Sequence, residues 1–485
     1  QKQKGESVMN SLVLLIVCIA VLAVGYIFYG GWLCRQWGVG ESKEETPAHS
    51  MEDGVDYIKL PRWRVFLIQL LNIAGTGPIF GAILGACFGP VAFLWITLGC
   101  IFFGAMHDYL SGMLILRHDG KSLPEVIGEY LGMGTRAVVR VFSIALLVLV
   151  GAVFILSPAQ LLSTMVSSVT QQVWVYIILA YYIIATLLPV DKVIGKIYPL
   201  FGVALVAMAA GLLVVLLSGE YEIPELTTLH NFQLDPEALP IIPTLFITIA
   251  CGAISGFHAT QSPLMARCVA SEKKCKSVFY GSMISEGIIA LIWAAIAMAF
   301  FHGPAALGEQ LSAHGNNAAW AVDVISNTTL GKVGAILALL GVVAAPITSG
   351  DTAFRGARLI IADIFSYNQR PILNRMIVCI PLFVIGFGIT LVEFGVVWRY
   401  FAWANQTLAV FTLWTIYVWL VRRKKNFWVA LIPAIVMTFI STYFVFLSPQ
   451  FMGVTDKLIS APLGVISTIV ITFFAYKKAY KNNPK

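Results

Sequence analysis

The sequence contains few charged residues. Only 12% of its 485 residues are Asp, Glu, Lys or Arg, about half the fraction typical of soluble proteins. Hydrophobic residues make up 58%. This balance excludes an ordinary soluble protein and predicts an all-α integral membrane protein, because helices satisfy their own backbone hydrogen bonds in hydrocarbon. The net charge of +7 gives no indication of nucleic-acid binding, because the basic residues lie in short connections between apolar runs.

Several motifs of enzymes and pumps are also missing. The sequence has no Walker A loop, no GxSxG and no HExxH, so ATP-driven transport and the common hydrolase reactions have no support. Its eight cysteines include no CxxC pair, and we interpret them as small packing residues and not as disulfides or zinc ligands. We therefore expect no enzymatic activity and no cofactor.

Apolar runs alternate with connections of contrasting charge. The connection 219–239 has five acidic residues and no Lys or Arg, and the connection 158–172 has no charge at all, whereas every second connection is basic. Because Lys and Arg remain on the cytoplasmic side, this alternation predicts an odd number of spans, an external N-terminus and a cytoplasmic C-terminus. The thirteen predicted spans are 8–34, 64–86, 89–115, 137–157, 173–189, 198–218, 240–260, 278–302, 332–350, 375–395, 398–420, 427–447 and 459–478.

A helix-breaking stretch interrupts the second run. Gly75, Gly77 and Pro78 are poor helix formers within a segment that is otherwise long enough to cross a bilayer. An opened backbone cannot face lipid, so it must face protein or a water-filled cavity. Two interpretations stay open, a packing kink or a ligand site formed by the freed backbone groups.

The seventh run contains a second break, at Ser255-Gly256-Phe257-His258. The two interrupted runs enter the membrane from opposite sides, and each opens a unit of five runs. This pattern is typical of inverted-repeat secondary transporters, so we predict about thirteen transmembrane helices with a 5+5, LeuT-like core. The predicted parts are 1–63 (first helix and cytoplasmic connection), 64–218 (repeat one), 239–420 (repeat two) and 421–485 (two helices and cytoplasmic tail).

Ionisable residues inside apolar runs are candidates for ion coupling, because they are costly to bury in a membrane. Asp108 lies beside His107 in the third run, and His258 lies in the second break. We expect Asp108 or His258 to carry a proton. The alternatives are an interfacial Asp108 and a neutral His258 that caps a half-helix. Glu286 has no visible partner in the sequence, and an interfacial position is its simplest interpretation.

The ninth run ends with four oxygen-bearing side chains, Thr348, Ser349, Asp351 and Thr352. If the hydroxyls face carbonyls freed at the first break, they form a cage suited to sodium. Asp351 could instead carry the coupling proton. The structural alternative is an N-cap at Asp351 or Thr352 for a helix over 354–365.

The predicted binding set combines both breaks with polar residues of the eleventh run. Helix N-termini at the breaks would favour an anionic group of the substrate. The predicted substrate-binding residues are Asn72, Gly75, Thr76, Gly77, Ser255, Gly256, Phe257, His258, Asn405 and Gln406. The predicted ion-coupling residues are Asp108, His258, Thr348, Ser349 and Asp351. We expect no resident metal; the weaker alternative is a metal site of His107, Asp108, His258 and Asp351, since two histidines and two carboxylates suit zinc or iron.

Together these motifs resemble the carbon starvation protein (CstA) family. The resemblance covers about residues 15–420, and the chain resembles a short member of the family. It is carried by Gly75–Pro78, Gly104-Ala105 before Asp108, Arg117–Leu123, Ser255–His258, Thr348–Arg355, Thr46–Ala48 and Asp53–Tyr57. It implies uptake of peptides or pyruvate, coupled to protons, in the bacterial inner membrane. It also implies a plan similar to that of the amino acid–polyamine–cation superfamily.

The expected function is therefore a secondary active symporter with alternating access, which imports peptides or a small carboxylate such as pyruvate. A sodium-coupled amino-acid or organic-anion symporter is the first alternative, and a metal-binding membrane sensor or a channel is an alternative of another class. The coupling ion stays open between proton and sodium. Expected partners are a small-molecule substrate and the lipid bilayer, with no nucleic acid; a homo-oligomer is compatible with the sequence.

Overall fold

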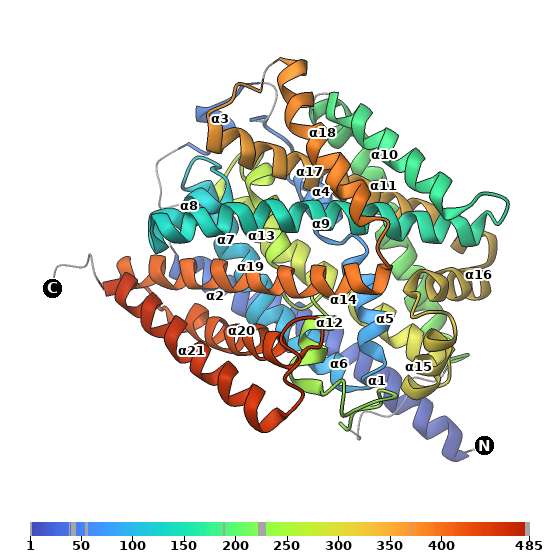
Figure 1. The fold of residues 1–485 in the computed structure, drawn as a ribbon. Coiled ribbons are helices and arrows are strands. Elements are labelled where there is room, and N and C mark those ends of the chain that lie inside the picture. Colours follow the sequence, from blue (N-terminus) through green and yellow to red (C-terminus); the bar gives the residue numbers. More distant parts are fainter. Residues whose placement is uncertain are drawn as a thin grey trace.

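The computed structural model is built of helices (Figure 1). It describes residues 2–37, 39, 45–53, 57–187, 190–221, 229–369 and 371–480. Residues 54–56, which belong to the motif at 53–57, lie outside the described residues. The helices are α1 (Lys2–Val24), α2 (Gly30–Gln36), α3 (Pro47–Ser50), α4 (Arg62–Ile73), α5 (Gly77–Ala86), α6 (Val91–Leu94), α7 (Met106–Leu116), α8 (Leu123–Leu131), α9 (Met133–Met165), α10 (Gln171–Leu187), α11 (Val190–Leu217), α12 (Phe246–Thr248), α13 (Gly256–Ala266), α14 (Gly281–Phe300), α15 (Pro304–Ala313), α16 (Ala318–Leu337), α17 (Ala344–Phe365), α18 (Ile372–Ile389), α19 (Phe394–Arg422), α20 (Trp428–Leu447) and α21 (Lys457–Tyr480).

The predicted spans coincide with these helices. Among the described residues, ten helical segments are long and apolar enough to cross a membrane, and the bent pair α4 and α5 makes eleven. The shorter apolar helix α10 and the interrupted segment around α12 and α13 correspond to the remaining two predicted spans. The predicted all-α membrane fold is thereby confirmed.

The ninth predicted span is longer than the sequence indicated. Helix α17 continues from Ala344 to Phe365, so Asp351 and Thr352 lie inside it. The predicted helix start at these residues is therefore wrong. Upstream, Gly331 adopts a positive φ of 56° that separates two helical parts of α16.

The first break lies where the sequence predicts it. Helix α4 ends at Ile73, α5 begins at Gly77, and the two helices are bent by 48°. Pro78 lies in the first turn of α5, where its missing N–H has no intrahelical partner to lose.

The second break faces the first. The backbone between α12 and α13 is not helical, and Gly252 has a φ of +91°, which is accessible to glycine without strain. A Cβ on Gly77 would lie 2.5 Å from the Cys251 sulfur. The two breaks are therefore in direct contact inside the protein, as an opened backbone within a membrane requires.

The core helices form two packed groups. Helices α4, α5, α7, α13 and α14 pack on one another, and α9, α10, α17 and α18 form the second group. Helix α19 lies against α9 and α13, with α20 and α21 on its other side (Figure 1). The first break faces the second group at the Phe154 ring of α9, whereas the second break packs against α5, α14 and α19.

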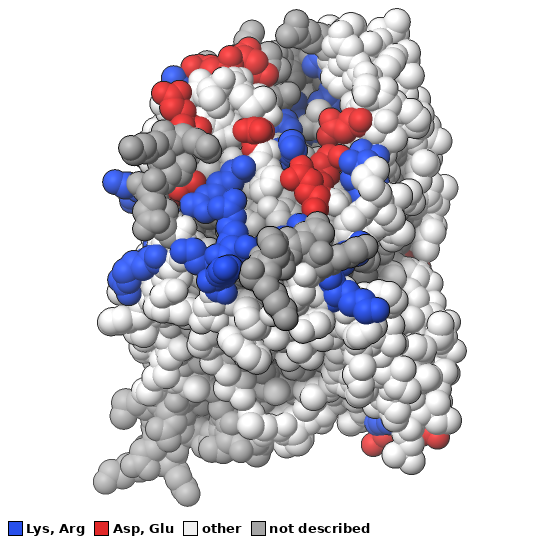
Figure 2. Space-filling view, turned by 90° about the vertical axis from the view of Figure 1, so that its left-hand side faces the viewer, with Lys and Arg blue, Asp and Glu red and all other residues white. Residues whose placement is uncertain are grey.

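The basic connections lie together at one end of the molecule. Arg267, after α13, donates to the carbonyl of Gly120, after α7. Arg422, at the end of α19, donates to the carbonyls of Tyr130 in α8 and Lys478 in α21. Figure 2 shows Lys and Arg gathered with Asp and Glu on this face, which lies on the left in Figure 1.

We expect Gly256→Ala to lower the stability of the protein and Gly388→Ala to leave its stability unchanged. A Cβ on Gly256 would lie 2.3 Å from the backbone nitrogen of Ala409 and 2.4 Å from the carbonyl oxygen of Asn405, whereas nothing lies within 4 Å of a Cβ on Gly388. Overpacking of this kind costs about 1–3 kcal/mol. Thermal unfolding of the purified variants tests this, and equal melting temperatures would contradict the close approach of α13 to α19.

Candidate functional site

Four ionisable side chains form a buried chain beside the second break. In α7, His107 Nδ1 lies 2.8 Å from Asp108 Oδ1. The other carboxylate oxygen of Asp108 lies 2.8 Å from Nδ1 of His258 in α13. His258 Nε2 is 3.4 Å from Glu286 Oε2 in α14. All four residues are fully buried, so each charge is balanced by its neighbours and not by water.

The position of Glu286 differs from the one that the sequence suggested. The sequence suggested an interfacial residue, but its side chain has no exposed surface, and its Oε1 accepts a hydrogen bond from the backbone N–H of Gly252 at 3.2 Å. Glu286 therefore connects the ionisable chain to the opened backbone. The position of Glu286 within an apolar run could have identified it as a candidate site residue. Burying a charged side chain in a membrane is as costly for Glu286 as it is for Asp108.

Asn405 and Gln406 of α19 bind the backbone of the second break. Asn405 Oδ1 accepts from the backbone N–H of Phe257 at 2.7 Å and from the Ser255 hydroxyl at 3.0 Å. Helix α13 has no side-chain cap of its own, so this amide takes that role.

Gln406 satisfies the other side of the same break. Its Nε2 lies 3.1–3.3 Å from the carbonyl oxygens of Phe246, Ala250 and Ile254. Asn405 and Gln406 thus both contact the break: Asn405 also bonds the Ser255 hydroxyl and the Cys251 sulfur, and Gln406 Oε1 has no hydrogen-bond partner among the described residues. That these two residues bind substrate stays a prediction.

The first break is covered by aromatic rings and flanked by polar amides. A Cβ on Gly75 would lie 2.8 Å from the Phe154 ring of α9, and this ring lies 6.0 Å from that of Phe257. In the last two turns of α4, Gln69 and Asn72 are fully buried, and neither amide has a hydrogen-bond partner among the described residues. Such groups are costly unless a ligand or water meets them.

One member of the predicted oxygen cluster on α17 contacts the helix before the first break, whereas the Thr348 and Thr352 hydroxyls donate to carbonyls of α17 itself. The Ser349 hydroxyl donates to the carbonyl of Leu71 in α4 at 2.9 Å. Asp351, however, has different partners from the ionisable chain: the Tyr198 hydroxyl lies 3.2 Å from it, and Arg355, one turn along α17, lies 3.6 Å from it.

The four-residue metal group predicted as a weaker alternative does not assemble, because Asp351 faces these other partners. Instead, ligand atoms of Cys251, His258 and Glu286 all lie within 4.8 Å of one another. The Cys251 sulfur also lies 3.6 Å from Asn405 Nδ2, so this cysteine has a polar neighbour in addition to its packing against Gly77. A thiol, an imidazole and a carboxylate are groups that bind zinc.

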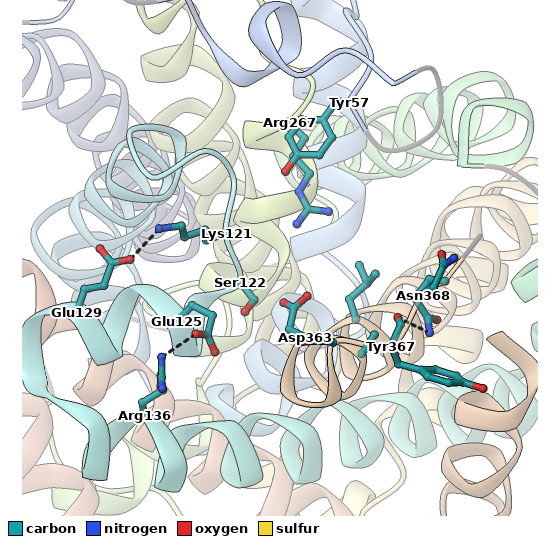
Figure 3. A pocket seen from close by; sticks show the side chains of 14 residues that line it. Tyr57, Lys121, Ser122, Glu125, Glu129, Arg136, Arg267, Asp363, Tyr367 and Asn368 are labelled. Atoms are coloured by element: carbon teal, nitrogen blue, oxygen red, sulfur yellow. Dashed lines mark hydrogen bonds and ion pairs between the residues drawn. The ribbon is translucent and has the colours of Figure 1, made fainter. Parts of the chain in front are cut away.

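A charged pocket of about 670 Å³ opens at the basic end (Figure 3). Its walls come from α8, the start of α9, and the ends of α13 and α17. Arg267 stacks over the Tyr57 ring on one wall, and Asp363 lies across from it. Lys121 forms an ion pair with the Glu129 carboxylate at 2.9 Å, which raises the pKa of Lys121, so its ammonium group stays protonated at neutral pH. The pocket lies where the two groups of core helices reach the surface.

We expect Asn405→Ala to lower the melting temperature by several degrees. The substitution leaves the buried Phe257 N–H without its acceptor, which costs about 1–3 kcal/mol. Asn327→Ala is the matched control, because Asn327 hydrogen-bonds only at the surface, to Asp323, and the change should stay within about 0.5 kcal/mol. Differential scanning fluorimetry in detergent measures both; an undisturbed Asn405→Ala protein would show that the amide does not hold the break.

Comparison with known proteins places this arrangement in a family. The family model described as Carbon starvation protein CstA matches residues 10–170 and 159–333. A protein from Haemophilus influenzae named Uncharacterized membrane protein is 44% identical over 347 residues, which cover 61% of this chain and 93% of the relative. The Peptide transporter CstA of Helicobacter pylori is 26% identical, with 60% and 51% covered. The Pyruvate/proton symporter BtsT of Escherichia coli is 24% identical, with 60% and 49% covered.

The chain thus spans about half the length of the relatives named as transporters, as predicted for a short member. Among solved structures, MhsT in complex with L-phenylalanine has a TM-score of 0.52 at 15% identity, over 86% of this chain and 99% of that one. The manganese transporter of Eremococcus coleocola has a TM-score of 0.50 at 12% identity, over 89% and 99%. Both show the fold, and because the family model matches more than half of the sequence, this chain belongs to the carbon starvation protein CstA family.

Proposed function

We propose that this chain is a secondary active transporter that imports a carboxylate-bearing solute, a peptide or a small acid such as pyruvate, together with protons. Its fold is shared with transporters of known structure, and relatives are named for peptide and for pyruvate/proton transport. The bacterial inner membrane, with the basic face toward the cytoplasm, is the corresponding location.

The observation that carries proton coupling is the buried chain from His107 through Asp108 and His258 to Glu286. Its links of 2.8, 2.8 and 3.4 Å connect groups that can each hold or release a proton. Because Glu286 accepts from Gly252, a change in its protonation acts directly on the second break. Substrate binding and proton binding would thereby be linked through one backbone segment.

The substrate would lie where the two breaks meet. The N-terminal ends of α5 and α13 carry the positive end of the helix dipole, which favours a negative group. At α13 the Phe257 N–H already bonds Asn405, so the dipole and not this N–H supports the proposal. Asn72 and Gln69 offer amide hydrogens to the same carboxylate, and the Phe154 and Phe257 rings would contact its apolar part. A carboxylate is common to peptides and pyruvate, so this set does not choose between them.

Sodium coupling is the second candidate, and the contact between Ser349 and the Leu71 carbonyl favours it. Here two oxygens from different helices already lie 2.9 Å apart at the first break, and oxygen ligands suit a hard cation. The Tyr198 hydroxyl lies 3.3 Å from the Thr348 carbonyl and 3.2 Å from Asp351. These contacts form a separate polar cluster that could hold such an ion.

We expect Asp108→Asn and Glu286→Gln to abolish concentrative uptake while leaving exchange of internal for external substrate in place. Each change keeps the size of the side chain but removes a proton-binding group. Labelled pyruvate and a labelled dipeptide would be supplied to proteoliposomes under an inward proton gradient. Asp323→Asn is the matched control, because Asp323 lies outside the ionisable chain and, among the described residues, it accepts its hydrogen bond from the exposed Asn327 amide. Normal accumulation by both relay variants, with folding verified by size-exclusion chromatography, would show that coupling lies elsewhere.

We also expect a proton gradient in sodium-free buffer to drive uptake, and a sodium gradient alone to drive none. The same proteoliposomes test this by flux under each gradient separately. If uptake required sodium and Thr348→Ala with Ser349→Ala removed that requirement, coupling would be assigned to the α17 hydroxyls. Insensitivity to chelators in this assay separates a transporter from the metal-dependent alternative.

A further inference from the structure

An apolar crevice lies outside the core, between α19, α20 and α21. Its volume is about 390 Å³, and Phe411, Trp414, Ile471 and Ala475 contribute to its walls. Phe474 also lines it, with 61% of its surface exposed. Only 22% of the most apolar window of α21 is buried, so the crevice is open toward the bilayer.

The polar atoms in its walls already have partners. The hydroxyls of Thr407 and Ser441 lie 2.7 Å apart, and Trp414 Nε1 donates to Thr438 Oγ1 at 3.0 Å. Thr442 donates to the carbonyl of Thr438 at 2.8 Å. A polar solute would find few unmet hydrogen-bonding groups here, whereas a hydrocarbon chain needs none.

One end of the crevice is basic. Lys478 lines it, and a Cβ on Gly132 would lie 2.8 Å from Lys478 Nζ, so the ammonium group rests on the junction of α8 and α9. Arg422 lies beside the backbone of Lys478. The Arg422 guanidinium group donates to the Lys478 carbonyl at 3.1 Å and to the Tyr130 carbonyl at 3.3 Å. Within the described part of the chain, no ion pair involves Lys478 or Arg422.

At this end α19 finishes with Arg422, after which Arg423 and Lys424 follow, and Lys477 and Lys478 lie in the last turn of α21. The hydrogen bond from Arg422 to the Lys478 carbonyl brings these two helix ends together. Charged side chains at the end of an apolar slot between membrane helices match the two parts of a lipid. Basic pockets of this kind recognise anionic headgroups, and the apolar crevice can accommodate an acyl chain.

We propose that this crevice binds one anionic phospholipid from the leaflet at the basic face. One acyl chain lies between α19 and α21, and the phosphate is held by Lys478 and Arg422. The bound lipid fills the gap between α21, which lies outside the five-plus-five core, and the junction of α8 and α9. This site is separate from the ionisable chain, so its occupancy is measurable without any assay of transport.

The test is native mass spectrometry of the purified full-length protein, delipidated and then titrated with an equimolar mixture of phosphatidylglycerol and phosphatidylcholine. The wild type is expected to retain one phosphatidylglycerol several-fold more strongly than phosphatidylcholine. Lys478→Ala should remove this preference, and Lys478→Arg should keep it. Lys477→Ala is the matched control, because Lys477 lies over the Phe473 ring at 4.4 Å and does not line the crevice.

A second variant tests the chain site. Ala475→Leu narrows the slot without altering charge, so binding of both lipids at this site should weaken together. Melting temperatures and size-exclusion profiles confirm that each variant is folded. Equal retention of the two lipids by the wild type, or an undiminished phosphatidylglycerol preference in Lys478→Ala, would overturn the proposal. Either result stands whether or not the chain proves to be a proton-coupled transporter.

Discussion

The structure depends on one constraint: a backbone that is opened inside a membrane must find its hydrogen bonds within the protein. The second break meets this constraint through a neighbouring helix. Asn405 supplies an acceptor for the N–H of Phe257, and Gln406 supplies a donor near three carbonyls. Because these amides are adjacent in α19, the unwound segment cannot close into a regular helix without leaving both of them unsatisfied. The local shape of the site is thus fixed by side chains that lie about 150 residues later.

The buried charges follow the same logic. Removing one partner from a buried ionic network typically costs about 3–5 kcal/mol, so truncating one residue of the chain from His107 to Glu286 would leave its neighbours with an unbalanced buried charge. Its far end is attached to Gly252, whose positive φ belongs to the break itself. Charge, backbone conformation and the packing of α7, α13 and α14 are therefore mutually dependent, whereas Asp351 has its own neutralising partner in Arg355.

Much of the fold could be predicted from the sequence, because apolar runs, breaks and the asymmetry of basic loops are local signals. Gly75, Gly77 and Pro78 located the first break, and Ser255 and Gly256 the second. The partners of the buried residues could not be predicted in the same way. Arg355 follows Asp351 by four residues, so their pairing could have been predicted once both are placed in one helix. Nothing near Asn405, in contrast, indicates that its amide caps another helix. Phe154 was missed because one more phenylalanine in an apolar run carries no distinguishing signal.

Some contacts near the two breaks lie within one group of core helices, and others join the two groups. Asp108, His258 and Glu286 all belong to one group, whereas the hydrogen bond from Ser349 to Leu71 joins α17 to α4 across the boundary. A rotation of one group against the other would carry the ionisable residues along as a rigid unit and would stretch the Ser349 bond. Together with the 3.4 Å hydrogen bond from the Ser157 hydroxyl of α9 to the Thr76 hydroxyl, that bond would then act as a latch, and the energy of the rotation would be set at this boundary.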